Sequence, residues 1–214
     1  MSRIVVFGAG GNAGRRAVAE AVTRGHRVTA VVRDAAKHRQ LAAEGVTLVE
    51  GDVTEAGSVA AVAAGHDAVI STVFRADVAP ADFYGEVSRA LVAGLTEAGV
   101  SRLVAVGVGT ALEAAPGVAV HDSPGFPEEY RQFSIGHSVE NDVYRASALD
   151  WVVVTPPPTV LDADAERTGS YRVGGPGVLP TEEGAPAFSY ADLAVALVDV
   201  ATRDDHHREV IAVG

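Results

Sequence analysis

Four glycines lie within seven residues near the start of the chain, in the segment FGAGGNAGRR. They are Gly8, Gly10, Gly11 and Gly14. Glycine weakens helices and strands alike, so its concentration indicates that the backbone comes close to another group. An apolar, β-branched run precedes the glycines and helix formers follow them, which predicts a strand-to-helix turn. Backbone N–H groups at a helix start bind anions, and this pattern predicts a paired phosphate.

Two spacings describe the glycine segment. Gly8, Gly10 and Ala13 fit G-x-G-x-x-A, whereas Gly8, Gly11 and Gly14 fit G-x-x-G-x-x-G. Either spacing would turn the first amides of the helix toward a diphosphate, with support from the helix dipole. The alternative is an ordinary glycine-rich turn. The position of the segment at the first strand-to-helix connection favours the dinucleotide.

The end of the second predicted strand carries the residues that would select between dinucleotides. The sequence there is AVVRDAAK, with Arg33 first, Asp34 second and Lys37 one helical turn further on. About 20 residues beyond such glycines, an acid binds the free 2′-hydroxyl of NAD, whereas an arginine binds the 2′-phosphate of NADP. Because Arg33 leaves the strand first, we favour NADP and keep NAD as the alternative. An arginine that is simply exposed to solvent would give the same sequence pattern.

Alternating strands and helices must position these residues. We expect parallel strands at residues 3–7, 27–32, 46–50, 67–72, 102–107 and 151–155, and a short last strand at 209–214. These runs are apolar on both faces, which is typical of strands covered by helices on either side. Helical stretches lie between them, and Gly25 is placed to end the first helix in a left-handed cap. The chain therefore predicts one α/β domain over residues 1–214, built on a doubly wound parallel sheet.

The second half of the chain contains the material for a substrate side. Nine of the ten prolines follow residue 115. We expect loops within 111–130 and 156–188 to form the wall of a pocket, as a small C-terminal lobe on the sheet. Ser189 and Asp192 are spaced for a capping box at the start of the last helix. Leu193, Leu197 and Val200 follow as its buried stripe.

Composition excludes several classes of protein. Hydrophobic residues make up 48% of the chain and charged residues 21%, which is typical of a folded globular protein. The net charge of −11 argues against a nucleic-acid surface. No apolar run approaches the ~18 residues that span a bilayer, and the first residues lack a signal-peptide pattern, so we expect a cytoplasmic protein without a membrane partner. The chain has no cysteine, and no histidine or carboxylate array predicts a metal site.

The order of the motifs resembles a known family. The segments GAGGNAG, VVRDAAK, EGDVTE, HDAVIST, LVAVGVGTAL and LDWVVVTPPP follow one another as in the atypical short-chain dehydrogenase/reductases. Within that family, the chain is most similar to the branch of NmrA-like and NADH-flavin reductase-like proteins that bind NAD(P)(H). The tail from Arg167 onward is similar as well, so the resemblance covers nearly the whole chain. It implies a Rossmann fold and a nicotinamide cofactor.

The resemblance also implies roles by position. The glycine segment would line the diphosphate, with Asn12 and Ala13 beside the glycines. Asp52 would flank the adenine or, alternatively, form a turn that begins a helix. The implied positions further along are Val53 at the adenine, Ser71, Thr72 and Val73 at the cofactor ribose, Gly107 and the residues up to 110 near the nicotinamide, and Pro156 and Pro157 at its border. Ser71 and Thr72 have a structural alternative, since they could simply cap the end of a strand.

Catalysis is where this chain departs from the family. Orthodox members use a Tyr-x-x-x-Lys pair, in which the lysine lowers the pKa of the tyrosine. Here Phe133 stands at the tyrosine position and His137 at the lysine position, so the usual proton relay is missing. Thr110 is the hydroxyl nearest to the position of the usual serine. Tyr130, one turn before Phe133, and His121, in a proline-rich loop, are the other candidates for a proton donor.

These candidates have alternatives. His121 would cap local backbone, and His137 would hydrogen-bond the nicotinamide ribose instead of moving a proton. Glu140 and Tyr144, on the same predicted helix, would face structure or solvent. Tyr171 would either cover the pocket or pack as an ordinary aromatic residue.

Three functions fit these residues. An NADPH-dependent reductase that passes hydride to a flavin or quinone needs little proton machinery, because such acceptors delocalise the incoming charge. A non-catalytic sensor of the NADP(H) pool would need none. A non-redox isomerase is the third, because a fold does not fix a function. We expect a small-molecule partner and no nucleic acid, and a homodimer is compatible with the sequence.

Overall fold

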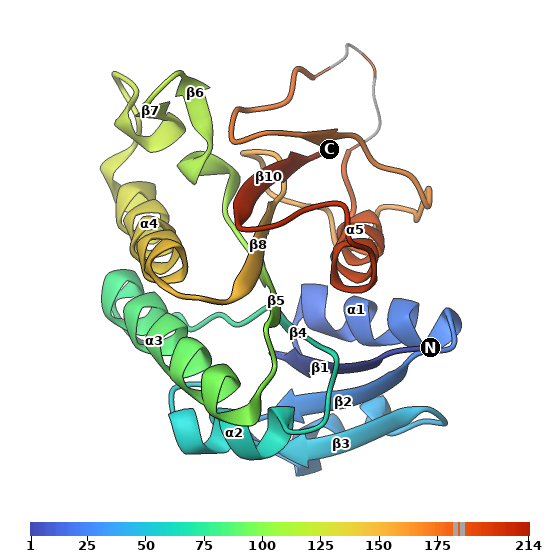
Figure 1. Cartoon of the computed structure of the whole chain (residues 1–214). Coiled ribbons are helices and arrows are strands. Elements are labelled where there is room, and N and C mark those ends of the chain that lie inside the picture. The colour runs from blue at the N-terminus through green and yellow to red at the C-terminus, as the bar shows by residue number, and fades with distance from the viewer. Residues whose placement is uncertain (182–183, 185–186) are drawn as a thin grey trace.

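One sheet forms the centre of the protein, and the computed structural model describes residues 1–181, 184 and 187–214. The strands of the sheet are β1 (Arg3–Phe7), β2 (Arg27–Val32), β3 (Val46–Glu50), β4 (Ala68–Ser71), β5 (Arg102–Val106), β8 (Asp150–Thr155), β9 (Val173–Gly174) and β10 (Glu209–Val213). Within the described residues their order is β3-β2-β1-β4-β5-β8-β10-β9 (Figure 1). All neighbouring strands are parallel except β9 and β10. The order reverses between β1 and β4, and such sheets bind ligands outside the carboxyl ends of the strands at that point.

Two layers of helices cover the sheet (Figure 1). Helices cover both faces because the strands are apolar on both. In β1, Ile4 and Val6 are buried on one face, and Val5 and Phe7 are buried on the other. The helices are α1 (Asn12–Thr23) and α5 (Tyr190–Thr202) on the first face, with α2 (Ala56–Ala63), α3 (Pro80–Ala98) and α4 (Glu128–Ala146) on the second. The predicted doubly wound sheet is confirmed.

Most predicted boundaries agree with the structure to within one residue. The first helix ends as expected, with Gly25 at a φ of +80° just beyond its last turn. The hydroxyl of Ser189 accepts a hydrogen bond from the Asp192 N–H at 2.9 Å, which is the expected cap of α5. In a capping box the Asp192 carboxylate would accept from the Ser189 N–H. Here it accepts instead from the N–H groups of Thr168 and Gly169. That carboxylate therefore holds a loop in place.

The two segments predicted to form the substrate side contain more order than the sequence indicates. The first segment contains the hairpin of β6 (Glu113–Ala115) and β7 (Val118–Ala119), with the short 3₁₀ turns η2 (Gly109–Ala111) and η3 (Val120–Asp122) on either side. The second segment contains β9, and four of its residues, 182–183 and 185–186, lie outside the described part. Glu113 joins the two segments, since its N–H binds Pro176 O at 2.9 Å and its carbonyl accepts from Val178 N at 3.0 Å.

The described residues contain neither a membrane-spanning helix nor a cluster of metal-binding side chains. None of their helices combines the length and the apolar character needed to cross a membrane. No three histidine or acidic side chains among them come together in a way that could hold a metal ion. The cytoplasmic location stays a prediction.

Candidate functional site

The glycine turn brings α1 directly against the ends of β1 and β4. Gly8 has a φ of +76°, in the left-handed region, and a Cβ there would lie 2.8 Å from the carbonyl oxygen of Thr72. A Cβ on Gly14 would overlap the carbonyl oxygen of Gly8. The Thr72 hydroxyl donates to the carbonyl oxygens of Phe7 at 3.0 Å and Gly8 at 3.2 Å. Two of the glycines are therefore required by the protein's own packing.

Gly11 differs from these two glycines. It is exposed, its φ of −77° suits any residue, and a Cβ there would meet only the Gly8 carbonyl oxygen at 3.4 Å. It stands at the N-cap of α1, where no side chain caps the helix. The amides of Asn12, Ala13 and Gly14 consequently have no acceptor among the described residues. These open amides fit an external anion.

Gly10 has a neighbour that sequence reasoning missed. A Cβ on Gly10 would overlap the imidazole of His38, which follows β2 in the 3₁₀ segment η1 (Ala35–Leu41). The Nδ1 atom of His38 is buried without a hydrogen-bond partner in the described structure. Nothing in the spacing of the sequence indicates this contact, because it depends on how η1 folds back over the turn.

At the end of β2, the two residues that could select between NADP and NAD differ in their contacts. The Asp34 carboxylate caps η1 by accepting from Lys37 N at 3.2 Å, and it pairs with Lys37 Nζ at 3.1 Å. The hydrogen bond from Lys37 lowers the pKa of Asp34. Arg33 is exposed and forms no hydrogen bond or ion pair with any described residue. Arg33 is thus the available charge at this position, whereas Asp34 and Lys37 hold each other.

A second group of charges lies beside Arg33, at the ends of β3 and β4. The Asp52 carboxylate accepts from the Thr54 N–H at 2.9 Å and the Thr54 hydroxyl at 2.7 Å, in the turn that precedes α2. These bonds lower the pKa of Asp52, and the guanidinium groups of Arg33 and Arg75 contribute. Arg75 in turn binds Asp77, with Nε 2.9 Å from Oδ1. Asp52 therefore makes the contacts of a turn residue that precedes a helix, which was its structural alternative. Val53, which follows it, is partly buried against the hydrophobic core.

The loops after β5 and β8 fit closely together at the same edge. Gly107 N donates to Val154 O at 3.0 Å, and a Cβ on Gly109 would overlap the backbone of Pro157. Pro156 is buried and Pro157 is partly buried. The two loops therefore contact each other at the carboxyl edge of the sheet, and the position of these residues beside the nicotinamide stays a prediction.

Two of the candidate proton donors, Thr110 and His121, already make hydrogen-bond contacts within the protein. The Thr110 hydroxyl lies 2.6 Å from Ser134 Oγ on α4, and Nδ1 of buried His121 lies 2.9 Å from the Thr110 carbonyl oxygen. His121 thus makes the local backbone contact that was its alternative. Tyr130 is 59% exposed, and no described residue bonds its hydroxyl. The structure brings Thr110 and His121 together and leaves Tyr130 at the surface.

An aromatic cluster lies between the end of β4 and the first half of α4. It consists of Phe74, Tyr84, Phe133 and His137. Phe133 meets Phe74 and Tyr84 edge to face at 5.8 Å between ring centroids, and His137 at 5.0 Å. Phe74 is 60% exposed, so the cluster opens to solvent at that end. At the position that the resemblance assigns to a proton-transferring tyrosine, the chain therefore has the apolar ring of Phe133.

His137 also takes part in a buried polar group. Its Nδ1 lies 2.8 Å from Oε2 of Glu140, and the hydroxyl of Tyr144 donates to Oε1 of Glu140 at 2.9 Å. His137 is 4% exposed and Glu140 is 2% exposed. Glu140 and Tyr144 therefore face the interior of the structure, where the carboxylate is a direct partner of a candidate site residue.

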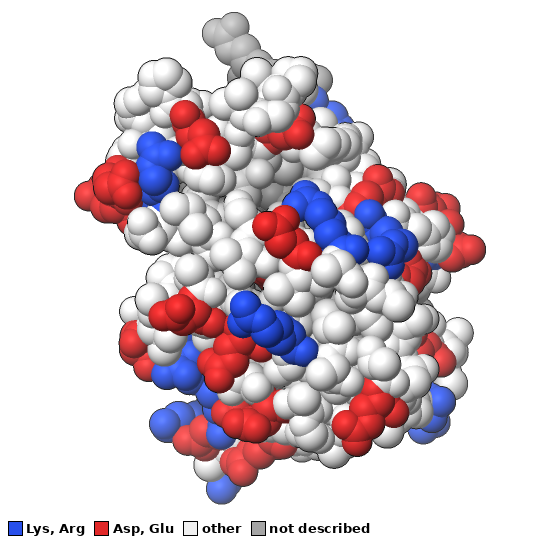
Figure 2. Space-filling view, turned by 60° about the vertical axis from the view of Figure 1, so that its left-hand side comes forward, with Lys and Arg blue, Asp and Glu red and all other residues white. Residues whose placement is uncertain are grey.

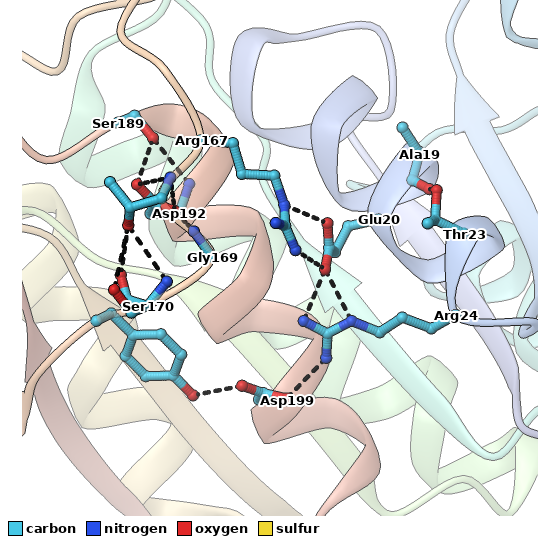
Figure 3. Close-up of polar contacts among 12 residues, drawn as sticks. Ala19, Glu20, Thr23, Arg24, Arg167, Gly169, Ser170, Ser189, Asp192 and Asp199 are labelled. Carbon is cyan, nitrogen blue, oxygen red and sulfur yellow. Dashed lines mark hydrogen bonds and ion pairs between the residues drawn. The ribbon is translucent and has the colours of Figure 1, made fainter.

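The loop that precedes β9 is tied to α1 and α5 by a network of charges (Figure 3). Glu20 of α1 binds Arg167 of the loop at 2.9 Å and Arg24 at 2.8 Å. Arg24 reaches Asp199 of α5 at 2.7 Å, and the Tyr171 hydroxyl donates to the same carboxylate at 2.9 Å. Burial would raise the pKa of Glu20, but its bonds with Arg167 and Arg24 outweigh that effect and lower it. Tyr171 is thus hydrogen-bonded to α5 and packs partly buried against the core.

A hollow of about 780 Å³ lies at the amino ends of β1 to β3, on the opposite edge of the sheet, and Arg3, Arg27 and His66 are among its lining residues. On the face shown in Figure 2, basic and acidic side chains lie next to one another, with uncharged surface between the groups.

A family model described as NAD(P)H-binding matches residues 8–204 of this chain. The protein YwnB of Bacillus subtilis is 33% identical over 211 residues, which cover 97% of this chain and 95% of YwnB. These matches extend over the glycine turn, the strand ends and the last helix alike.

Two solved structures match the whole chain. The Bacteroides thetaiotaomicron protein named "putative epimerase" is 31% identical with a TM-score of 0.87, and the match covers 100% of this chain and 96% of that one. The Streptococcus pneumoniae protein named "putative NADH-flavin reductase" is 30% identical with a TM-score of 0.83, and the match covers 100% of this chain and 99% of that one. The two names describe different chemistries on one fold.

Proposed function

Because this chain belongs to the NAD(P)H-binding family, we propose that it is an NADPH-dependent oxidoreductase that passes hydride to a flavin, a quinone or a similar conjugated acceptor. The observation that carries the proposal is the aromatic cluster around Phe133. A planar acceptor can stack on such rings, and it needs no tyrosine to protonate it. The name of the Streptococcus pneumoniae neighbour supports the same chemistry.

The cofactor end of the proposal rests on two features. The open amides of Asn12, Ala13 and Gly14 suit a diphosphate, because they have no acceptor within the described protein. The guanidinium of Arg33, which forms no ion pair with any described residue, suits a 2′-phosphate, whereas Asp34 pairs with Lys37. These features favour NADPH over NADH.

The chain's own residues would act by positioning. When bound, NADPH supplies a hydride from its nicotinamide ring, and a proton from water completes the reduction of the acceptor. Thr72 fixes the turn that receives the diphosphate through its bonds to Phe7 and Gly8. The ring of Phe133 keeps water from one side of the acceptor, and exposed Phe74 offers it a stacking surface.

The test is the steady-state oxidation of NADPH, followed by its absorbance, with FMN, FAD and small quinones as acceptors. We expect turnover above background with at least one of them. Phe74→Ala should raise KM for that acceptor several-fold and leave NADPH binding unchanged, because Phe74 lies on the acceptor side. Tight NADPH binding without turnover for any acceptor would contradict the reductase.

The isomerase remains the other candidate, and the name of the Bacteroides thetaiotaomicron neighbour favours it. A non-redox isomerase does not consume its cofactor, so no net oxidation of NADPH would accompany turnover. The same absorbance experiment therefore separates the two enzymes.

A further inference from the structure

The hollow at the amino ends of β1, β2 and β3 carries more positive than negative side chains, although the chain as a whole has a net charge of −11. Arg3 and Arg27 line it, and among its described lining residues Glu44 is the one acidic side chain. Its volume of about 780 Å³ lies within the range of about 300–1,000 Å³ that is typical of ligand pockets. The hollow is at the opposite edge of the sheet from the glycine turn, so it is separate from the candidate cofactor site.

The register of the sheet places the two arginines side by side. Arg3 of β1 pairs with Arg27 of β2 in the parallel ladder. Side chains alternate along a strand, so both arginines lie on the same face as Val5 and Val31, which α2 and α3 cover. Because α2 ends at Ala63, both arginines remain exposed. Two positive charges at paired positions repel each other, and an anion between them would remove that repulsion.

The protein supplies no counter-charge to this pair. Neither guanidinium forms a hydrogen bond or an ion pair with any described residue, and Glu44 likewise has no ion-pair partner there. Asp67 is the other acid close to Arg3, but its carboxylate accepts from the Arg3 backbone N–H at 2.7 Å. The two guanidinium groups are therefore available to a ligand.

A third arginine in the same sheet shows the contrasting arrangement. Arg102 begins β5, as Arg3 begins β1 and Arg27 begins β2. Its paired residue on the neighbouring strand β8 is Asp150, and the two side chains form an ion pair at 2.8 Å. At the start of β5 the register thus brings an acid to the arginine, whereas at the start of β1 it brings a second arginine.

The polar neighbours of the pair include one unoccupied hydroxyl. Thr29 and Thr47 are paired on β2 and β3, two residues along the strand from Arg27 and on the same face. Thr29 Oγ1 lies 2.8 Å from Nε2 of His66, so that hydroxyl is occupied. Thr47 is exposed, and its hydroxyl forms no hydrogen bond with any described residue. Burial lowers the pKa of His26, another lining residue, so its imidazole stays neutral near pH 7 and adds no charge.

We propose that this hollow binds the phosphate group of a small-molecule ligand, with the guanidinium groups of Arg3 and Arg27 sharing the anion and the Thr47 hydroxyl donating to it. Guanidinium groups match phosphate oxygens in a bidentate geometry. A phosphate dianion neutralises both arginines, whereas a monocarboxylate neutralises one. The inference goes beyond the proposed function, because it needs neither the nicotinamide cofactor nor hydride transfer.

Titrations followed by the backbone amide signals of the full chain test the site and locate it. The ligands are inorganic phosphate, glycerol 3-phosphate and acetate, at constant pH and ionic strength. We expect both phosphate compounds to shift the signals of residues 27–29 and 45–47 and to saturate them at a much lower concentration than acetate. Tighter binding of the ester identifies a phosphorylated metabolite as the ligand, and tighter binding of inorganic phosphate identifies the free ion. Shifts confined to residues 10–14 would belong to the candidate cofactor site, and that result, or acetate binding as tightly as phosphate, would overturn the proposal.

Four variants make the titration specific. Arg3→Gln and Arg27→Gln should each raise the Kd of inorganic phosphate in the hollow by at least about 10-fold, because each removes hydrogen bonds to a charged group. Glu44→Gln should lower that Kd, because it removes the negative charge from the lining. Arg89→Gln is the matched control, since Arg89 is exposed on α3 and has no ion pair with a described residue. Its Kd should stay within about twofold of wild type, and equal losses in Arg89→Gln and Arg27→Gln would overturn the proposal.

Thermal unfolding gives a second readout that an ordinary structural arginine would not produce. Without phosphate, Arg27→Gln should have a Tm no lower than wild type, because the substitution removes the repulsion from Arg3. Added inorganic phosphate should then raise the Tm of wild type more than that of Arg27→Gln, because only wild type has the complete site. A lower Tm for Arg27→Gln in the absence of phosphate would mean that the guanidinium serves the fold, and would contradict the proposal.

Discussion

Arg33 is the residue whose substitution separates the two nicotinamide cofactors most directly. Arg33→Ala should weaken NADPH binding by roughly 10- to 100-fold, because hydrogen bonds to a charged group contribute about 1.5–3 kcal/mol. NADH has no 2′-phosphate and should lose little. Isothermal calorimetry with both nucleotides measures the difference. Lys37→Ala is the matched control, because Lys37 already pairs with Asp34, and equal losses for the two nucleotides in Arg33→Ala would refute the assignment.

Gly11 and Gly14 are expected to fail in opposite ways when each is replaced by alanine. Gly11→Ala should fold normally, because its Cβ meets no described atom closer than 3.4 Å. It should bind the dinucleotide more weakly, because the added methyl group stands next to the amides proposed to hold the diphosphate. Gly14→Ala should lose about 1–3 kcal/mol of unfolding free energy, because its Cβ overlaps the Gly8 carbonyl oxygen. Urea unfolding and cofactor titration of both variants measure this. A stable Gly14→Ala protein would contradict the packing argument.

The sequence predicts the residues of this site that act through backbone position. The glycine spacing and the place of Arg33 follow from local order along the chain, and in the structure the glycines lie in the turn between β1 and α1 and Arg33 lies just after β2. His38, Arg75 and Glu140 could not be found in this way. Each of them meets its partners through a fold-back, a loop or the buried side of a helix, and the residue types alone look like ordinary surface charge or packing.

At the scale of elements, Glu20 joins α1, α5 and the loop before β9. Glu20→Gln should lower the unfolding free energy by about 1–3 kcal/mol near neutral pH, because Glu20 is 8% exposed and bonds two arginines. The lower end of the range allows for the solvent exposure of Arg167.

The same substitution should change the response to acid. The pKa of Glu20 is lower in the folded protein than its ordinary value of 4.5. The ionised form therefore contributes stability above about pH 4.5, and the contribution is lost as the pH falls through the folded pKa. Urea unfolding at several pH values should show a shallower loss below pH 4.5 in Glu20→Gln than in wild type. Parallel curves would mean that Glu20 is not a source of acid sensitivity.

The long elements follow from sequence more faithfully than the short ones. Strands such as β2 and helices such as α5 are apolar over their whole buried length, so the pattern predicts their type and nearly their ends. The hairpin of β6 and β7 and the strand β9 have two or three residues each. Their hydrogen bonds come from partners distant in the chain, such as Pro176 for Glu113, and no local periodicity can indicate them.

At the scale of the whole molecule, binding the dinucleotide should stabilise the fold. Free NADPH at 100 times its Kd contributes about 2.7 kcal/mol, which in a domain of this size corresponds to a rise in Tm of roughly 5–10 °C. Differential scanning fluorimetry measures the shift. Arg33→Ala at the same NADPH concentration should shift less, and a wild-type Tm that no nicotinamide nucleotide changes would count against the cofactor assignment.

The interlocked loops after β5 and β8 have a consequence for the newly synthesised protein. The residues proposed to bind the phosphates of the cofactor lie in the turn after β1, at the start of α1 and at the end of β2, all within the first third of the chain. The facing wall needs Pro157 over Gly109, Pro176 beside Glu113, and β10 between β8 and β9. During synthesis the residues proposed to bind the phosphates of the cofactor are therefore made before β10, whose place between β8 and β9 the facing wall needs.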